Sequence, residues 1–301
     1  MDRLVDRAGV ERAGVDDAVV GPSLEAKVNA GDTEAAERHQ PQKSVSNSRL
    51  VSIVAPILTA LLAIGLWALV TLVISGPTSH IRPFNPLDAS RALARLISDG
   101  AIWLDIKVSL MRLASGLGIA AIVGISVGCL TGSVPLIEKA TTPVFQFIRM
   151  ISPVAWTPVA IVVMGVGSAP AIALIALTAV WPLILNTSAG VKAIPHGWTS
   201  LARSLGATRV EAFRTVIAPA IRLPVLTGLR VALGVAWIVL VPVEMLGSSE
   251  GLGYAIVNAK DALAYDELIA AIVIVGVLGF CLDSALRYLI SKASFPSKGD
   301  H

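Results

Sequence analysis

The sequence predicts an all-α integral membrane protein with about six transmembrane helices, because its apolar residues form long uninterrupted runs. Hydrophobic residues make up 54% of the 301 residues and charged residues only 15%, whereas soluble domains carry about 25% charge. The mean hydropathy is +0.75. Backbone N–H and C=O groups in hydrocarbon need partners within the protein, which leaves helices or a closed barrel. The apolar runs are continuous rather than alternating, and this favours helices.

The N-terminal region contains a polar tail followed by the first span. Residues 1–48 are mixed in charge and poor in aromatic residues, which is typical of disorder, and we expect a cytoplasmic tail there. The first apolar run, 50–75, begins too far along the chain for a cleavable signal peptide, so it should be retained as a span. Residues 86–103 mix apolar and charged residues and predict a helix lying at the membrane interface. Residues 49–104 therefore hold the first span and this interfacial helix.

Residues 105–292 are predicted to be one core domain, and residues 293–301 a cytoplasmic tail. The second span repeats small residues at every fourth position from Gly116 to Gly132, which predicts close packing against another helix in preference to a pore-lining role. The spans expected in this domain are 108–130, 144–166, 169–190, 223–246 and 268–289.

Basic residues in the short loops indicate the orientation. The loop 191–222 carries five Lys or Arg residues against one acid, and should be cytoplasmic. The loop 247–266 is acidic and should face outward, which places both termini inside. The region before the second span disagrees, because it carries Arg82, Arg91 and Arg95 on the side predicted to be outside.

Ionisable and polar residues inside spans are candidates for a translocation path. Arg149 is expected near the cytoplasmic start of the third span. The alternative to a role in the path is that its side chain only extends to the membrane interface. Glu244 is expected near the outer end of the fifth span. The alternative to a role in the path is that partial exposure to solvent there makes a carboxylate tolerable. Prolines in spans either break helices around a path or are simply tolerated. The candidates for the path are Arg149, Pro153, Trp156, Asn186, Trp237 and Glu244.

The polar loop between the fourth and fifth spans predicts two short helices, 198–205 and 209–217. Gly206 is placed to end the first helix in a left-handed conformation, and Pro219 follows the second. Such a helix–turn–helix projection can bind in a groove of a soluble partner, the alternative being an ordinary connector.

This loop resembles the EAA motif of bacterial importer permeases, in which Glu-Ala-Ala, three residues, Gly, nine residues and Ile-x-Leu-Pro follow one another. Ala202, Gly206 and Pro219 match that pattern, while Ser200 stands in the place of the glutamate. The resemblance implies that the loop, within residues 192–222, couples the chain to an ATPase. The residues assigned to coupling are Ser200, Leu201, Ala202, Arg203, Ser204, Leu205, Gly206, Ala207 and Pro219.

Other segments resemble permeases of the nitrate, sulfonate, taurine and bicarbonate group, over about residues 105–290. They are 149–158, 181–187, 227–230 and 244–254, and the first two are more similar to the nitrate-type branch. The resemblance implies the MetI-like fold of type I ATP-binding-cassette importers, in the inner or plasma membrane. It also implies a permease homodimer, cytoplasmic ATPase subunits that bind ATP and Mg²⁺, and an external solute-binding protein. No cofactor is then expected in this chain.

Other classes of function have less support. The sequence has no G-x-x-x-x-G-K-[ST] phosphate loop, nucleophile elbow or cluster with metal-ligand spacing, so an enzyme is not expected. The net charge is only +3, without a basic patch interleaved with aromatic residues, which argues against nucleic acid. A stand-alone secondary carrier is the alternative, but the two halves show no internal repeat. Sulfonate, taurine or bicarbonate are alternatives to nitrate as the imported solute.

Overall fold

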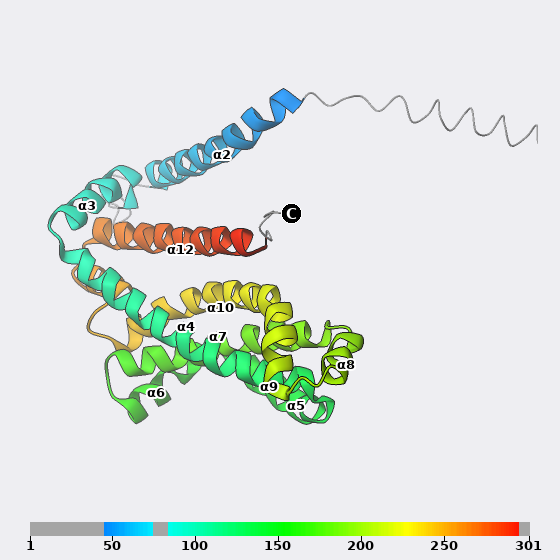
Figure 1. The fold of residues 1–301 in the computed structure, drawn as a ribbon. Coiled ribbons are helices and arrows are strands. Elements are labelled where there is room, and N and C mark those ends of the chain that lie inside the picture. Colours follow the sequence, from blue (N-terminus) through cyan, green and yellow to red (C-terminus); the bar gives the residue numbers. More distant parts are fainter. Residues whose placement is uncertain (1–44, 75–83, 295–301) are drawn as a thin grey trace, which may run out of the picture. The chain divides into compact units, whose positions relative to one another are not determined.

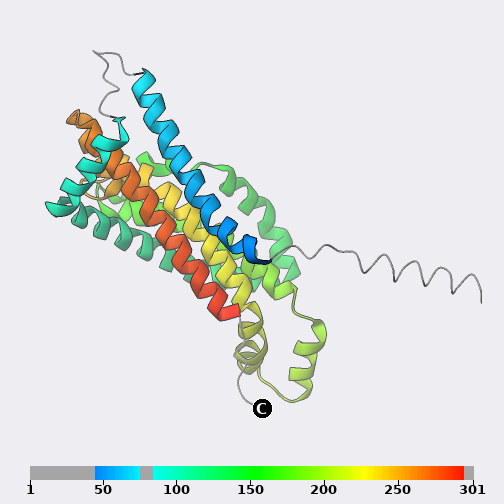
Figure 2. The same ribbon diagram turned by 90° about the horizontal axis from the view of Figure 1, so that it is seen from above.

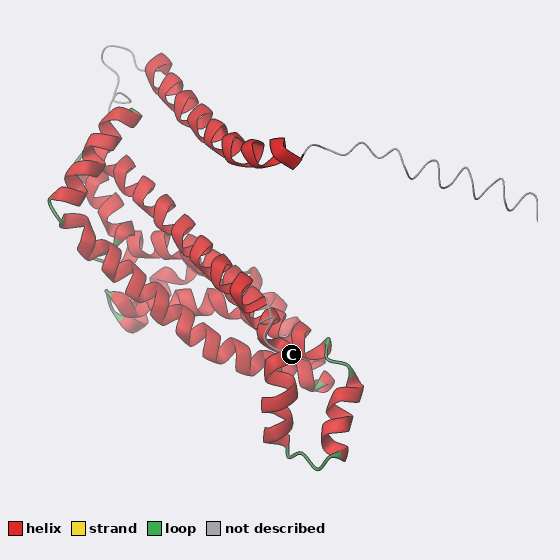
Figure 3. Cartoon of the chain, turned by 45° about the horizontal axis from the view of Figure 1, so that its top comes forward, coloured by secondary structure: helices red, strands yellow, loops and turns green. Residues whose placement is uncertain are grey.

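The computed structural model describes residues 45–74 and 84–294, and every described element is helical (Figure 3). The tails predicted at 1–48 and 293–301 lie almost entirely outside the described residues. The chain divides into two units, residues 1–62 and 63–301. The elements are α2 (Val45–Ile74), α3 (Pro86–Ser98), α4 (Ala101–Ser133), α5 (Pro135–Met150), the 3₁₀ helix η2 (Pro153–Trp156), α6 (Thr157–Met164), α7 (Ser168–Lys192), α8 (His196–Ser204), α9 (Arg209–Ala212), the π-helix η3 (Phe213–Ile217), α10 (Ala218–Gly247), α11 (Leu252–Asp261) and α12 (Tyr265–Ser294).

Helices α4, α7 and α10 form the core of the second unit (Figure 1). The small-residue stripe of α4 lies against α7. A Cβ added to Gly116 would lie 2.5 Å from Ile175 Cγ2, and one added to Gly124 would lie 2.6 Å from Leu183 Cβ. The predicted packing role of the stripe is therefore confirmed. Residue numbers rise together along the contact, so α4 and α7 run parallel.

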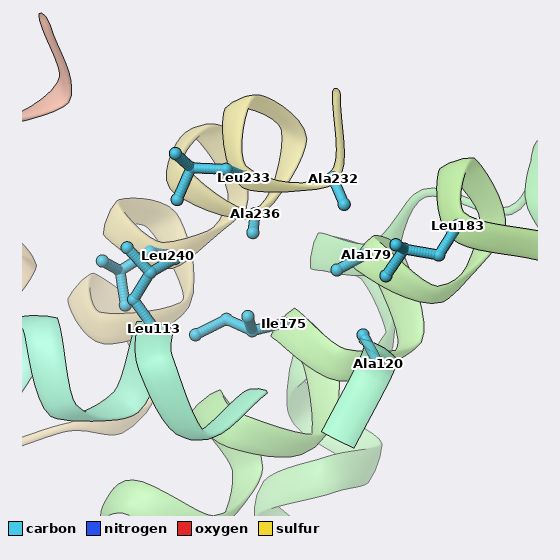
Figure 4. Close-up of a cluster of buried hydrophobic side chains, with 9 residues drawn as sticks. All are labelled: Leu113, Ala120, Ile175, Ala179, Leu183, Ala232, Leu233, Ala236 and Leu240. Atoms are coloured by element: carbon cyan, nitrogen blue, oxygen red, sulfur yellow. The ribbon is translucent and has the colours of Figure 1, made fainter. Parts of the chain in front are cut away.

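A cluster of buried hydrophobic side chains lies where these three helices meet (Figure 4). Small residues alternate with branched ones, which lets the helices approach closely while the larger side chains fill the space between them. Burial of this cluster holds the three helices together. Its members are Leu113, Ala120, Ile175, Ala179, Leu183, Ala232, Leu233, Ala236 and Leu240.

The third predicted span is broken. We expected one continuous helix over 144–166, but α5 and the segment Pro153–Met164 meet at 81°. Ile151 and Ser152 are extended, with ψ of 127° and 125°, because the ring of Pro153 disfavours a helical conformation at the residue before it. Since α4 and α7 run parallel, residues 134–167 must return from one membrane face to the other, so the bent pair is one broken span.

The fifth span begins earlier than predicted. The sequence placed its start at residue 223 and expected Pro219 to end the preceding short helix. Instead, α9 continues through the π-helical turn η3 directly into α10. Pro219 therefore lies inside a continuous helix, directly after the π-helical turn η3, and local π-helical adjustment is one way in which spans tolerate a proline.

Among the described residues, the second unit therefore holds five candidate membrane spans, which are α4, the bent pair, α7, α10 and α12. Four of these are single helices long and apolar enough to span, and the bent pair is the fifth. The other predicted span, 50–75, coincides with α2, one helix of 30 residues with an apolar stretch at Leu58–Thr71. A helix was also predicted over 86–103, and α3 occupies the first part of that range.

Helix α12 runs alongside α10 (Figure 2), and the Arg230 Nε donates to Asp283 Oδ1 at 2.9 Å between them. At the other end of α12, Arg95 of α3 pairs with Asp266 at 2.6 Å. The loop residues 248–251, together with α3 and α11, thus lie at one end of the spans, and α8 and α9 lie at the other (Figure 1).

Candidate functional site

The segment 196–217 forms a compact projection that we call the knob. Its first helix, α8, ends in a Schellman motif: the Ala207 N–H donates to the Ala202 carbonyl and the Gly206 N–H to the Arg203 carbonyl, both at 3.0 Å. This closure requires a left-handed residue, and Gly206 has φ +82°. The predicted conformation of Gly206 is confirmed, although α8 covers His196–Ser204 where 198–205 was expected.

The knob's second part is fixed by a capping box. The Thr208 hydroxyl accepts from the Glu211 N–H at 3.3 Å, and the Glu211 carboxylate accepts from the Thr208 N–H at 2.8 Å. Both orphan backbone donors at the start of α9 are thereby satisfied. Because α9 continues through η3 into α10, a force applied to the knob acts directly on a membrane-spanning helix.

An apolar groove of about 750 Å³ lies between α8 and the η3–α10 junction. Leu205 is 80% exposed, and Trp198 and Leu201 are also exposed. Exposed apolar side chains gathered on a polar loop are typical of a surface that binds another protein. The groove is lined by Trp198, Leu201, Ala202, Leu205, Ala207, Thr215, Val216, Pro219 and Ala220.

Five of the nine predicted coupling residues line this groove, and all five are apolar. Leu201, Ala202, Leu205 and Ala207 reach it from the first half of the knob, and Pro219 reaches it from α10. Ser200, Arg203 and Ser204 lie on the exposed surface of α8, and the Ser204 hydroxyl donates to the Ser200 carbonyl at 3.1 Å. The structure thus brings the two ends of the sequence motif, eighteen residues apart, to one surface.

A buried polar network occupies the opposite end of the core. The Glu244 side chain is completely buried, and the Arg112 Nη1 donates to its carboxylate at 2.8 Å. The Ser109 hydroxyl lies 2.8 and 2.7 Å from the two carboxylate oxygens, and the Gly253 N–H donates at 3.0 Å. A buried charge with this many donors is electrostatically satisfied.

The same network holds the loop before α11. The Arg112 Nη1 also donates to the Glu250 carbonyl at 2.7 Å, and its Nε donates to the Ser168 hydroxyl at 3.0 Å. Gly251 has φ +110°, and a Cβ there would lie 2.6 Å from the Glu244 Oε1. The Gly251-Leu-Gly sequence is therefore needed to bring the loop backbone against the carboxylate of Glu244. The hydrogen bonds of this network join α4, α7, α10 and α11.

The other path candidates fall into two groups. Arg149, Pro153 and Trp156 belong to the bend between α5 and α6, and Arg149 lines a cleft facing α7. Arg149 was expected at the cytoplasmic start of its span, but α5 begins at Pro135 and places Arg149 at its far end. That expectation is wrong.

Asn186 and Trp237 lie in contacts between helices. The Asn186 Nδ2 donates to the Pro182 carbonyl at 2.8 Å, and its Cβ faces Gly228 of α10. The Trp237 ring packs against Gly279 of α12, where an added Cβ would lie 2.5 Å from the indole nitrogen. Both residues, like Glu244, contribute to packing within this subunit.

The partners of Glu244 were not predicted from the sequence. Ser109 and Arg112, with Asp105, which accepts from the Gly251 N–H at 2.7 Å, follow one another at intervals of four and three residues, which places three polar side chains on one face of an apolar helix. That pattern indicates a buried polar contact. Trp198 and Val216 were also absent from the predicted coupling set, although both line the groove.

Comparison with known families gives one match that covers more than half of the chain. Residues 116–294 match the family described as "Binding-protein-dependent transport system inner membrane component". The match begins within α4 and ends with α12, so it includes the knob, the bend and Glu244.

Curated relatives share this region. The bicarbonate transport system permease protein CmpB of Synechocystis sp. is 38% identical over 194 residues, which is 64% of this chain and 69% of that protein. The nitrate import permease protein NrtB of Leptolyngbya laminosa is 34% identical over 236 residues, covering 76% and 83%. The taurine transport system permease protein TauC of Escherichia coli is 32% identical over 244 residues, covering 80% and 88%.

Among solved structures, the fold is similar to a chain of the MetNI methionine ABC transporter in an inward-facing conformation. The TM-score is 0.55 at 17% identity, over 64% of this chain and 94% of that one. This likeness confirms the predicted MetI-like fold.

Proposed function

Because the chain belongs to the family of binding-protein-dependent transport system inner membrane components, we propose that it imports a small anion as the membrane subunit of a complex driven by ATP. The chain is an ABC importer permease of the group that includes the nitrate, bicarbonate and taurine permeases. The finer proposal is that the knob receives the movement of a cytoplasmic ATPase subunit and passes it to α10.

The apolar groove of the knob is the observation that carries this proposal. Trp198, Leu201 and Leu205 are exposed on a segment outside the spans, and burying them against a partner is favourable at roughly 25 cal/mol per Å² of apolar surface. The continuous helical path from α9 through η3 into α10 supplies the mechanical link. A stand-alone carrier would leave this surface without a purpose.

The proposed complex contains two copies of this chain, two ATPase subunits and an external solute-binding protein. The knob faces the cytoplasm and the Glu244 network lies at the outer end. This orientation is supported by the basic residues of the 191–222 loop. ATP and Mg²⁺ bind to the ATPase subunits, and this chain holds no cofactor.

Nitrate is the first solute to test, because the segments 149–158 and 181–187 resemble the nitrate-type branch. The complete complex should be reconstituted in liposomes with ATP inside the compartment that represents the cytoplasm. Uptake of labelled nitrate, bicarbonate and taurine is then measured with and without the binding protein. We expect ATP-dependent uptake of one of these anions. Uptake that continues without ATP or without the ATPase would instead identify a secondary carrier.

A further inference from the structure

Arg149 lies level with the middle of α7, and it is exposed on the surface of this subunit. Lys192 of α7 and Glu138 of α5 form an ion pair at the end of the core where α8 begins. Arg149 follows Glu138 by eleven residues and Trp181 precedes Lys192 by eleven, which is about 16 Å along either helix. Half of the hydrocarbon thickness is about 15 Å, so Arg149 is near the midplane. An arginine side chain is too short to reach back to that interface.

Arg149 also differs from two other arginines of the spans, Arg112 and Arg230, in having no partner among the described residues. Arg112 is paired with Glu244, and Arg230 is paired with Asp283. Within residues 45–74 and 84–294, by contrast, Arg149 makes no hydrogen bond or ion pair. A cation at membrane depth is unfavourable unless an anion or water accompanies it, so this position calls for a water-filled path or an anion from outside the chain.

The backbone next to Arg149 is non-helical, which is a feature of translocation paths in transporters. Ile151 and Ser152 are non-helical at the same depth. Irregular backbone at membrane depth is tolerated where protein buries it or where it lines a water-filled cavity. Broken helices at the midplane are also where transporters place their substrate sites.

A cleft of about 100 Å³ adjoins the guanidinium. Thr142, Gln146 and Arg149 share one face of α5, at intervals of four and three residues, and of these Gln146 and Arg149 can donate hydrogen bonds to a ligand. Trp181 closes the other side and makes an edge contact with Phe145, their ring centroids being 5.4 Å apart. The remaining lining residues are Ile184 and Leu185.

From this geometry we propose that the Arg149 cleft is the site where the transported anion rests at the middle of the membrane. The inference builds on the proposed function and names the group that recognises the substrate. The planar guanidinium offers parallel N–H donors to two oxygens of an oxyanion. Nitrate, bicarbonate and the sulfonate of taurine all present such a pair of oxygens. Gln146 supplies a neutral donor beside it, whereas the Thr142 hydroxyl donates to the Glu138 carbonyl at 2.7 Å.

The test compares Arg149→Gln with Arg149→Lys in the reconstituted complex. Arg149→Gln removes the charge and should lower the initial rate of anion uptake at least about tenfold, because a charge-assisted hydrogen-bond pair is lost. Arg149→Lys should lower the initial rate of uptake about threefold, since the ammonium keeps the charge but lacks the parallel pair of N–H donors. Lys139→Gln is the matched control: Lys139 lies on the same helix near its cytoplasmic end and is exposed. Uptake by this variant should equal that of the wild type.

A binding measurement on the purified permease separates this inference from the proposed function. Sodium nitrate, sodium bicarbonate or taurine should raise the melting temperature of the wild type and of Lys139→Gln, by mass action on the folded state. Arg149→Gln should show no such rise. If the wild type imports an anion and Arg149→Gln imports it equally well, the cleft is not the site, although the importer stands. If the wild type imports none of the three, the proposed function fails, and the melting shifts still decide whether Arg149 binds them.

Discussion

A charged side chain inside a span can be predicted from sequence, but its role depends on a partner that sequence does not reveal. Glu244 and Arg149 were both path candidates because both are ionisable and lie in apolar runs. Glu244 proves to be buried against Arg112, which is 132 residues away in the chain. Arg149, in contrast, has no hydrogen-bond or ion-pair partner among the described residues. Such long-range pairing follows from packing, and no local pattern around Glu244 contains it.

The buried ion pair should dominate the stability of the outer end of the core. Removing one member leaves the other as an uncompensated buried charge, which costs about 3–5 kcal/mol. We therefore expect Arg112→Met and Glu244→Gln each to lower the melting temperature of the detergent-solubilised permease substantially. The double variant should lose less than the sum of the two single losses, because neither charge is then stranded.

Lys107→Met provides the control for this measurement. Lys107 is exposed on the same helix as Arg112, and its removal should leave the melting temperature nearly unchanged. Single variants at Arg112 and Glu244 that melt like the wild type would show that the pair does not hold the outer loop.

At the scale of helices, periodic patterns were the most reliable guide. The repeat of small residues from Gly116 to Gly132 predicted a close helix contact, and α7 supplies the other side of it. The identity of that partner helix, and the parallel direction of the pair, could not be predicted. They depend on the broken span between α4 and α7, which was predicted to be continuous.

This contact gives a direct prediction about packing. A side chain at Gly124 would meet Leu183 Cβ at 2.6 Å, whereas nothing lies within 4 Å of a Cβ added to Gly118 of the same helix. Overpacking of this kind costs about 1–3 kcal/mol. Gly124→Val should therefore reduce the monodisperse fraction and the melting temperature in size-exclusion and thermal assays, and Gly118→Val should not. Equal behaviour of the two variants would contradict the close packing of α4 against α7.

Prolines show why the boundaries of elements were less predictable. Pro153 ends a helix because the residue before it is forced into an extended conformation. Pro219 was expected to do the same, yet it follows a π-helical turn and lies in the first turn of α10. The difference is the π-helical turn directly before Pro219, because such a local adjustment lets a membrane-spanning helix continue past a proline. Sequence spacing alone did not distinguish the two cases.

For the whole molecule, two of the three arginines that disagreed with the predicted orientation have partners, and the third, Arg82, lies outside the described residues. Arg95 pairs with Asp266, and Arg91 pairs with Asp88 at 3.1 Å. The charges of these arginines are compensated by nearby carboxylates at that end of the spans. The arginines are therefore weaker evidence that this end is cytoplasmic. The basic residues of the knob region have no comparable set of acids, so the proposed orientation with the knob inside is retained.

If the knob couples this permease to an ATPase, substitutions at Gly206 test that coupling most directly. Nothing in the chain lies within 4 Å of a Cβ added there, so a substitution affects the turn and whatever binds it. Gly206→Ala adds only the backbone penalty of a left-handed residue, about 1–2 kcal/mol. Gly206→Asp and Gly206→Asn have the same shape and both tolerate that conformation, so they differ in the charge that docking would have to desolvate.

The measurement is binding-protein-stimulated ATP hydrolysis by the reconstituted complex, with permease insertion checked in parallel. We expect Gly206→Asp to lower the stimulated rate at least about tenfold, with Gly206→Asn and Gly206→Ala clearly milder and all three variants inserted normally. If Gly206→Asp supported wild-type stimulation and transport, the loop would be a simple connector, and the knob would not couple the permease to an ATPase.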